Sequence, residues 1–187
     1  MAFEIELKAK LEDHLPVKER VSALGMYCRS YTKSDSYWIP GNVRIRSESG
    51  VNADGAEYNA VLVTYKAREM RDGIEVNDER EFTVSGLPLF EELLSRLGQS
   101  IDILKEKQGW AWDIQPDAGG EPSVLAELSL VTGLGWFLEL EILASDNSAQ
   151  TVAKHRERLL SLLAKLEVPA DQIEPMPYIK LLRESKK

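Results

Sequence analysis

Glutamate pairs spaced two residues apart occur at three places in the chain. Residues two apart in a β-strand point to the same face, so each pair would present two carboxylates side by side. Carboxylate oxygens are the ligands that hard divalent cations such as Mg²⁺ prefer. The sequence therefore predicts metal-binding chemistry on strands. The pairs are Glu4 and Glu6, Glu79 and Glu81, and Glu139 and Glu141.

Cationic pairs follow the same spacing on three other predicted strands. Arginine and lysine side chains on one strand face would bind an anion with several charged oxygens, such as a chain of phosphates. The pairs are Arg44 and Arg46, Lys66 and Arg68, and Lys105 and Lys107.

Each pair alone has a simpler interpretation, because charged residues are mostly exposed and one strand can place them in water. The recurrence of the same alternation on six segments instead predicts one shared charged interior. A closed antiparallel β-barrel with charges inward, apolar side chains outward and helices outside would give that arrangement. Its acids would hold a divalent cation, its cations would hold a polyanion, and the metal would link the two sets.

The remaining patterns predict an α+β fold with about eight antiparallel strands, a number that can close a barrel. The strands are expected at 3–8, 29–39, 42–47, 59–70, 75–85, 101–112, 123–131 and 136–143. Helices are expected at 12–26, between Pro88 and Gly98, at 148–166 and at 178–184, and 48–57 is expected to be a turn by composition.

Bulk properties limit the classes of partner. The 187 residues predict one domain. The net charge of −8, from 23 Lys and Arg against 31 Asp and Glu, disfavours non-specific binding to nucleic acid or anionic membranes. The single cysteine excludes an intrachain disulfide, and we see no signal peptide or membrane-spanning run. We therefore expect a cytoplasmic protein, in which an outward apolar strand edge could support a homodimer.

Taken in order, these motifs resemble the CYTH superfamily, also called triphosphate tunnel metalloenzymes. The resemblance rests on the opening Glu4-x-Glu6-x-Lys8 and on the ending Gly133-Leu134-Gly135-Trp136-Phe137-Leu138-Glu139-Leu140-Glu141. It extends from Phe3 to about Leu182, and the group includes class IV adenylyl cyclases, thiamine triphosphatases and inorganic triphosphatases. The resemblance implies an eight-stranded antiparallel tunnel, dependence on Mg²⁺ or Mn²⁺, and a triphosphate substrate.

The resemblance also implies roles for individual residues. Glu4, Glu6, Glu139 and Glu141 match the metal-binding acids, and Glu79 and Glu81 are further acidic positions. Lys8 matches a lysine that would contact phosphate or balance charge. The phosphate-binding cations of the superfamily are matched by Arg44, Arg46, Lys66 and Lys107. We add Arg68 and Lys105 to this set because they pair with Lys66 and Lys107 at the same spacing. Lys180 is added because it lies in the closing Tyr178-Ile179-Lys180-Leu181-Leu182.

Two positions depart from the pattern of the superfamily. Gly109 stands where members commonly have an arginine, which removes a phosphate contact. Ser129 stands where they commonly have an aspartate, which removes an acid near the metal. Glu127 has the same strand parity as Ser129 and could substitute for it. These departures leave open a tunnel that binds polyphosphate without turning it over.

The reaction also stays open at this point. Segments 106–108 and 130–135 look most like the class IV cyclases, which favours conversion of ATP to cyclic AMP and pyrophosphate. Hydrolysis of tripolyphosphate, thiamine triphosphate or a nucleoside triphosphate would use the same residues. The phosphate-binding residues alone do not distinguish these reactions.

Overall fold

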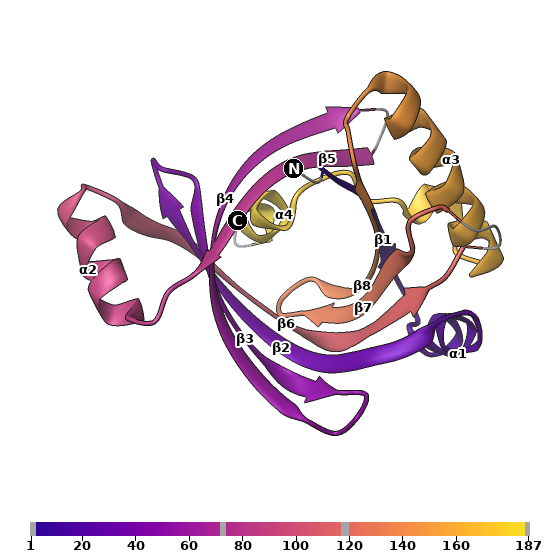
Figure 1. Cartoon of the computed structure of the whole chain (residues 1–187), viewed down its shortest axis with the longest axis horizontal. Coiled ribbons are helices and arrows are strands. Elements are labelled where there is room, and N and C mark those ends of the chain that lie inside the picture. The colour runs from indigo at the N-terminus through magenta and orange to yellow at the C-terminus, as the bar shows by residue number, and fades with distance from the viewer. Residues whose placement is uncertain (1–2, 72–73, 117–119, 186–187) are drawn as a thin grey trace.

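A computed structural model describes residues 3–71, 74–116 and 120–185. For residues 66–69 and 78–79 it describes the backbone only. Eight strands dominate the described part (Figure 1). They are β1 (Phe3–Leu11), β2 (Met26–Ile39), β3 (Val43–Asn52), β4 (Glu57–Arg71), β5 (Ile74–Thr83), β6 (Ser100–Ile114), β7 (Val124–Val131) and β8 (Gly135–Ala144). The helices are α1 (Leu15–Leu24), α2 (Leu87–Arg96), α3 (Ala149–Lys165), the short 3₁₀ helix η1 (Ala170–Gln172) and α4 (Tyr178–Glu184).

The strands form one antiparallel sheet in the order β1-β5-β4-β3-β2-β6-β7-β8. β1 pairs with β8 from Phe3 to Leu11, and with β5 over the shorter stretch from Phe3 to Glu6. The sheet therefore curves around a central space, as Figure 1 shows. The prediction of an α+β fold on an antiparallel sheet is confirmed.

The outer face of β1, β6, β7 and β8 carries the main hydrophobic core. Ile5 and Leu140 are fully buried there, together with Leu159 and Leu163 of α3. α3 follows Ser148, whose hydroxyl accepts a hydrogen bond from the Thr151 amide and so caps the helix. Because alternate strand residues take the apolar face, their charged neighbours are directed to the inner face.

A second, smaller core lies under α2, at the other end of the molecule (Figure 1). Leu94 of α2 packs with Trp38, Ile45 and Val63, which are buried on the outer face of β2, β3 and β4. Ile45 lies between Arg44 and Arg46 in sequence. Packing of this outer residue fixes the direction in which both arginines point.

Two element predictions were wrong in extent. Residues 48–57 are not one turn, because β3 continues to Asn52 and β4 starts at Glu57, with Glu48 paired to Ala60. Polar composition misled there because the inner face of this sheet is itself polar. The helix expected at 12–26 is shorter, since Pro16 lies in its first turn and β2 already begins at Met26. The helix expected at 178–184 is confirmed as α4.

Within the described ranges, no helix is long and apolar enough to cross a membrane. The C-terminal segment instead returns to the sheet. Ile173 forms a bridge with Ala9, and the Glu174 amide donates to the Lys8 carbonyl at 2.8 Å. This contact places α4 at the central space, where Figure 1 shows it between the strands.

Candidate functional site

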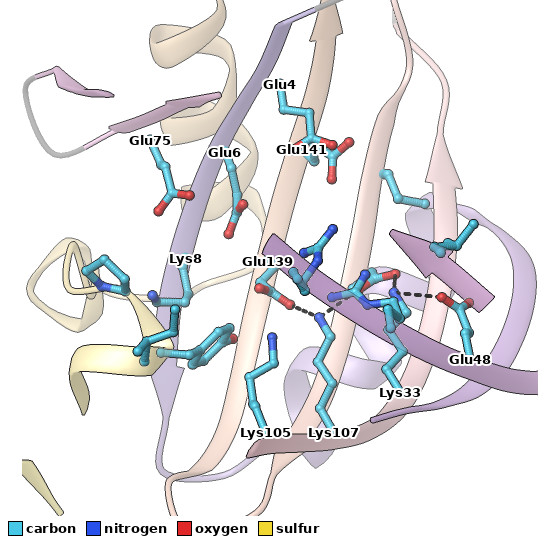
Figure 2. Close-up of a pocket in the computed structure, with 18 of the residues that line it drawn as sticks. Glu4, Glu6, Lys8, Lys33, Glu48, Glu75, Lys105, Lys107, Glu139 and Glu141 are labelled. Atoms are coloured by element: carbon cyan, nitrogen blue, oxygen red, sulfur yellow. Dashed lines mark hydrogen bonds and ion pairs between the residues drawn. The ribbon is translucent and has the colours of Figure 1, made fainter. Parts of the chain in front are cut away.

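A polar cavity of about 250 Å³ lies on the inner face of the sheet (Figure 2). We call it the inner cavity. Its described lining is mostly charged, with eight glutamates against seven lysines and arginines. The glutamates are Glu4, Glu6, Glu48, Glu75, Glu81, Glu127, Glu139 and Glu141, and the cations are Lys8, Arg29, Lys33, Arg44, Arg46, Lys105 and Lys107.

Asp35 organises one group of these cations. Its carboxylate is fully buried and accepts two hydrogen bonds from Arg46, at 2.7 Å from Nε and 2.9 Å from Nη2. Lys105 Nζ lies 2.9 Å from the same carboxylate. Burial alone would raise the pKa of Asp35, but Lys105 and Arg46 together hold it well below its usual range. Asp35 is therefore ionised and keeps both cations in place.

Glu127 organises a second group. Lys33 Nζ lies 2.6 Å from its Oε1 and Lys107 Nζ lies 2.9 Å from its Oε2, while the Tyr31 hydroxyl donates to Oε2 at 3.1 Å. Burial opposes ionisation of Glu127, yet Lys107 and Lys33 hold its pKa well below its usual range. We call the two groups, which lie on β2, β3, β6 and β7, the cation wall.

The opposite side of the inner cavity is acidic. Glu6 on β1 lies in register between Glu75 on β5 and Glu141 on β8. Like charges at directly opposed positions repel. Figure 2 shows these three carboxylates and that of Glu4 directed toward the same part of the cavity. With Glu139, these residues form what we call the acid wall.

The donor set of the acid wall fits a hard divalent cation, which takes carboxylate oxygens. Across the described residues, no three His, Cys, Asp or Glu side chains lie close enough together to form a ready-made metal centre. Mg²⁺ is compatible with such a site, because it usually keeps several waters and binds through one or two carboxylates plus substrate phosphates. A bound cation would also relieve the repulsion along the row of three glutamates.

Lys107 joins the two walls. Its ammonium group contacts Glu139 as well as Glu127, and these two glutamates stand opposite each other in the register of β7 and β8. Burial lowers the pKa of Lys107, but Glu127 and Glu139 raise it well above its usual range. Lys107 is therefore fixed as a cation where the acid wall begins.

Lys8 connects the cavity to the C-terminal segment. Its Nζ donates to the Met176 carbonyl at 2.5 Å and lies 4.3 Å from the centre of the Tyr178 ring. Burial lowers the pKa of Lys8, and Glu6 and Glu139 counteract this effect. The resemblance left phosphate contact and charge balance open for Lys8. The structure adds a further contact, which holds the start of α4 against the inner cavity.

Arg44 and Glu81 lie near the opening of the cavity. Arg44 Nη2 donates to Thr64 Oγ1 at 2.9 Å, and the same hydroxyl donates to Glu81 at 3.0 Å. The Glu81 side chain is 41% exposed, against 13% for Arg44. Arg44 is thus positioned from the neighbouring strand, whereas Glu81 faces solvent.

Most residues selected from the sequence line the inner cavity. The structure brings together Glu4, Glu6, Lys8, Arg44, Arg46, Glu81, Lys105, Lys107, Glu139 and Glu141. The side chains of Lys66, Arg68 and Glu79 lie outside the described residues. Lys180 does not line the inner cavity: it is exposed on α4 and borders a neighbouring cavity instead. In this turn of α4 the buried side chain is Tyr178, and Lys180, two residues later on the helix, points away from the inner cavity.

The two departures have different structural contexts. A Cβ atom at Gly109 would lie 2.1 Å from the Leu128 carbonyl oxygen, so no side chain fits there unless β6 and β7 move apart. Ser129 is fully buried, and its hydroxyl has no hydrogen-bond partner within the described part of the chain. Glu127, two residues away, supplies the inward carboxylate of β7.

Sequence reasoning missed four charged residues of β2 and β3, namely Arg29, Lys33, Asp35 and Glu48. A signal for β2 was present. Residues 29–37 alternate Arg, Tyr, Lys, Asp and Tyr with Ser and Thr, so large polar side chains recur at every second position. The outer positions of this strand are Ser and Thr, which hid the amphipathic pattern on which the other predictions relied.

A second cavity of about 650 Å³ adjoins the first and shares Tyr37, Arg44, Pro177 and Ile179 with it. Its lining is more apolar and includes three further side chains with large hydrophobic surfaces, Trp38, Ile39 and Tyr65. Lys180 and the paired Asp102 and Arg183 border it. The two cavities together have room for a charged chain joined to a planar organic group.

No protein-family model matches the sequence, and no curated protein matches it. Solved structures do share the fold. A protein of Pyrococcus horikoshii OT3 has 24% identity and a TM-score of 0.78, covering 98% of this chain and 99% of its own. A candidate adenylate cyclase of Vibrio parahaemolyticus has 19% identity and a TM-score of 0.69, covering 97% and 98%.

A plant protein from Hippeastrum, described as a candidate adenylyl cyclase with a dominant triphosphatase activity, has 11% identity and a TM-score of 0.64, covering 98% of this chain and 96% of its own. The Vibrio and Hippeastrum proteins have CYTH-type tunnel folds. This chain shares the α+β architecture on an antiparallel sheet with them, and closure of that sheet into an eight-stranded barrel stays a prediction.

Proposed function

We propose that this protein is a metal-dependent enzyme that cleaves a triphosphate bound in the inner cavity. The observation that carries the proposal is the division of this cavity into a buried cation wall and a facing acid wall. A triphosphate needs several cationic groups to neutralise it. The acid wall fits the divalent cation that accompanies such substrates in phosphoryl transfer.

The residues of the cation wall would bind and orient the phosphate chain. Arg46 and Lys105 are fixed by Asp35, and Lys107 is fixed by Glu127 and Glu139, so they need little reorganisation when the anion enters. Arg44 would contact the end of the chain near the opening. Positioning and electrostatic stabilisation supply most of the catalysis in phosphoryl transfer, and no protein nucleophile is required.

Glu4, Glu6, Glu139 and Glu141 would hold Mg²⁺ or Mn²⁺, with Glu75 as a further ligand. The bound ion would stabilise the charge that develops on the phosphate oxygens. The chain itself contributes the carboxylates and keeps them next to the cation wall through the contact between Lys107 and Glu139.

The second cavity favours a nucleoside triphosphate as substrate. Ile39 and Tyr65, which are both exposed, offer an apolar and aromatic surface next to Arg44, where a base and ribose attached to the phosphates would lie. Attack by the ribose 3′-hydroxyl on the α-phosphorus would give a cyclic nucleotide and pyrophosphate. We propose this class IV cyclase reaction first, as the sequence motifs also favour it.

Hydrolysis of a triphosphate is the second candidate. The charged residues lie in the inner cavity, so a bare phosphate chain could be bound there without the second cavity. The experiment is product analysis of the purified protein with Mg²⁺ or Mn²⁺ and ATP, tripolyphosphate or thiamine triphosphate.

Cyclic AMP with pyrophosphate would identify a cyclase, and orthophosphate release would identify a triphosphatase. A ligand-induced rise in melting temperature without any product would identify a binding protein. No product and no rise with any of the three would contradict the proposal. Glu4→Gln provides the background control, since turnover by a contaminating enzyme would persist in it.

A further inference from the structure

Lys33 is a buried cation of the inner cavity to which neither the spacing nor the resemblance gave a role. It lies on β2, and its side chain is only 4% exposed. Within the described chain its ammonium group has one hydrogen bond, to Glu127 at 2.6 Å, with Glu48 at 3.8 Å. The Tyr31 ring centre lies 4.1 Å from Nζ.

The position of Lys33 relative to Lys107 is unusual for two cations. The two residues stand directly opposite each other in the register of β2 and β6. Like charges at such positions repel. Glu127 offsets this repulsion by holding one ammonium on each carboxylate oxygen, at 2.6 Å and 2.9 Å. The result is a pair of ammonium groups fixed side by side at one wall of the cavity.

We propose that Lys33 is a further phosphate contact, and that Glu127 is a positioning residue that holds Lys33 and Lys107 together for one polyanion. This inference rests on the proposed function, because it assigns the ligand of the inner cavity to the phosphate class. An ammonium group has three N–H donors, and Lys33 gives one to Glu127. The other donors are available to a ligand oxygen in the inner cavity, which Lys33 lines.

The electrostatic state of Lys33 is consistent with this role. Burial lowers its pKa to about 8, with Glu127 opposing the shift and Lys107 and Arg46 reinforcing it. Glu127 therefore supplies only part of the negative charge that Lys33 needs. A polyanion beside it would supply more and would favour the charged form.

A structural role is the competing explanation, in which Lys33 only neutralises Glu127. The two roles differ in a double variant. Lys33→Gln combined with Glu127→Gln removes both charges of the pair and leaves Lys107 with Glu139. The comparison is with Glu127→Gln alone, because both variants lack the carboxylate that also positions Lys107. If Lys33 only neutralised Glu127, the double variant would bind as tightly as Glu127→Gln. If Lys33 contacts phosphate, the double variant binds more weakly than Glu127→Gln.

The experiment is calorimetric titration of tripolyphosphate into the full chain at fixed pH and salt. The matched control is Lys154→Gln, which makes the same change in charge on exposed α3, where Lys154 pairs with Glu121. We expect Lys33→Gln and the double variant to weaken binding at least about tenfold, as loss of a charged hydrogen bond does. Lys154→Gln should bind like the unmodified protein.

Wild-type affinity in Lys33→Gln, or in the double variant, would overturn this inference. Should Lys33→Gln fail to fold, the comparison of the charge-balanced double variant with Glu127→Gln decides. Arg44→Ala distinguishes a failure of the role of Lys33 from a failure of the proposed function. If Arg44→Ala loses affinity for tripolyphosphate and Lys33→Gln does not, only the role of Lys33 is overturned. If the unmodified protein does not bind tripolyphosphate, the proposed function and the role of Lys33 are both overturned.

Discussion

The cation wall and the acid wall of the inner cavity are built in opposite ways. The cation wall is buried and paired: Asp35 is inaccessible to solvent, and Arg46, Lys105, Lys33 and Lys107 are fixed by Asp35 and Glu127. The acid wall places like charges side by side, as in the row of Glu75, Glu6 and Glu141. Its members Glu4, Glu6 and Glu141 are only partly buried, whereas Glu75 is buried and Glu139 is as buried as Arg46.

This difference indicates which part of the site is formed before the ligand arrives. The buried cations lost their hydration when the chain folded, so a phosphate chain meets donors that are already oriented. Glu4, Glu6 and Glu141 keep partial contact with water, and the described residues contain no ready-made cluster of metal ligands. They can adjust to a hydrated cation that enters with the substrate. The predictions below test this contrast.

The largest expected effect is on stability, at Asp35. Asp35→Asn leaves Arg46 and Lys105 buried without their carboxylate, which should lower the free energy of unfolding by about 3–5 kcal/mol. Urea denaturation measures the loss. Glu4→Gln, on the acid wall, should cost less than about 1 kcal/mol in the same assay. Equal losses for the two variants would mean that the walls do not differ.

The next effect is on turnover, at Glu4. Glu4→Gln keeps the size of the side chain but removes a charge that would bind the metal. Metal-dependent turnover should fall on the order of 100-fold, equal to about 2.7 kcal/mol, while the fold stays intact. Steady-state rates at several Mg²⁺ concentrations give the effect. A fully active Glu4→Gln enzyme would show that the acid wall is not the metal site.

A smaller effect is expected on binding, at Arg44. Arg44→Ala should weaken the binding of tripolyphosphate about tenfold, or by about 1.4 kcal/mol, because one of several cationic contacts is lost. Orthophosphate should be affected less, since it need not reach the opening of the cavity. A competition experiment between the two ligands measures the dissociation constants of tripolyphosphate and of orthophosphate. Equal weakening of both would argue against a binding site spread over several strands.

The smallest effect is the dependence of stability on pH. The pKa values of Asp35 and Glu127 are both depressed in the folded protein. Their contribution to stability is therefore present when the pH is above their pKa values in the unfolded chain, which are about 4. It is lost as the pH falls below these pKa values. Two such carboxyls should lower the free energy of unfolding by about 1 kcal/mol between pH 6 and pH 4. Glu127→Gln should reduce this slope, and an unchanged slope would contradict the assigned charges.

Strand spacing was sufficient to predict much of the fold and of the site. Glu4 and Glu6, Arg44 and Arg46, and Glu139 and Glu141 alternate with apolar residues, so their shared face followed from period two alone. Their convergence on one cavity followed from the recurrence of that pattern on separate strands, and the structure places these six residues on the inner cavity.

What the sequence did not reveal depends on cross-strand neighbours. Asp35 looks like an isolated acid in the sequence, and Glu127 was considered only as a substitute for an acid at Ser129. The importance of both residues comes from cations on adjacent strands. Gly109 appeared to be a lost arginine, whereas the approach of the Leu128 carbonyl excludes any side chain there. Such contacts are set by strand order and register, which periodicity within one strand does not encode.

The most direct test of the central claim is the effect of Mg²⁺ on tripolyphosphate affinity in two proteins, the unmodified chain and Glu4→Gln, by calorimetry. Complexes between Mg²⁺ and tripolyphosphate in solution affect both titrations equally. We predict that Mg²⁺ tightens binding at least about tenfold in the unmodified protein. In Glu4→Gln, binding without Mg²⁺ should be retained and the tightening lost. Equal tightening in both proteins would contradict a metal held by the acid wall beside a phosphate chain on the cation wall.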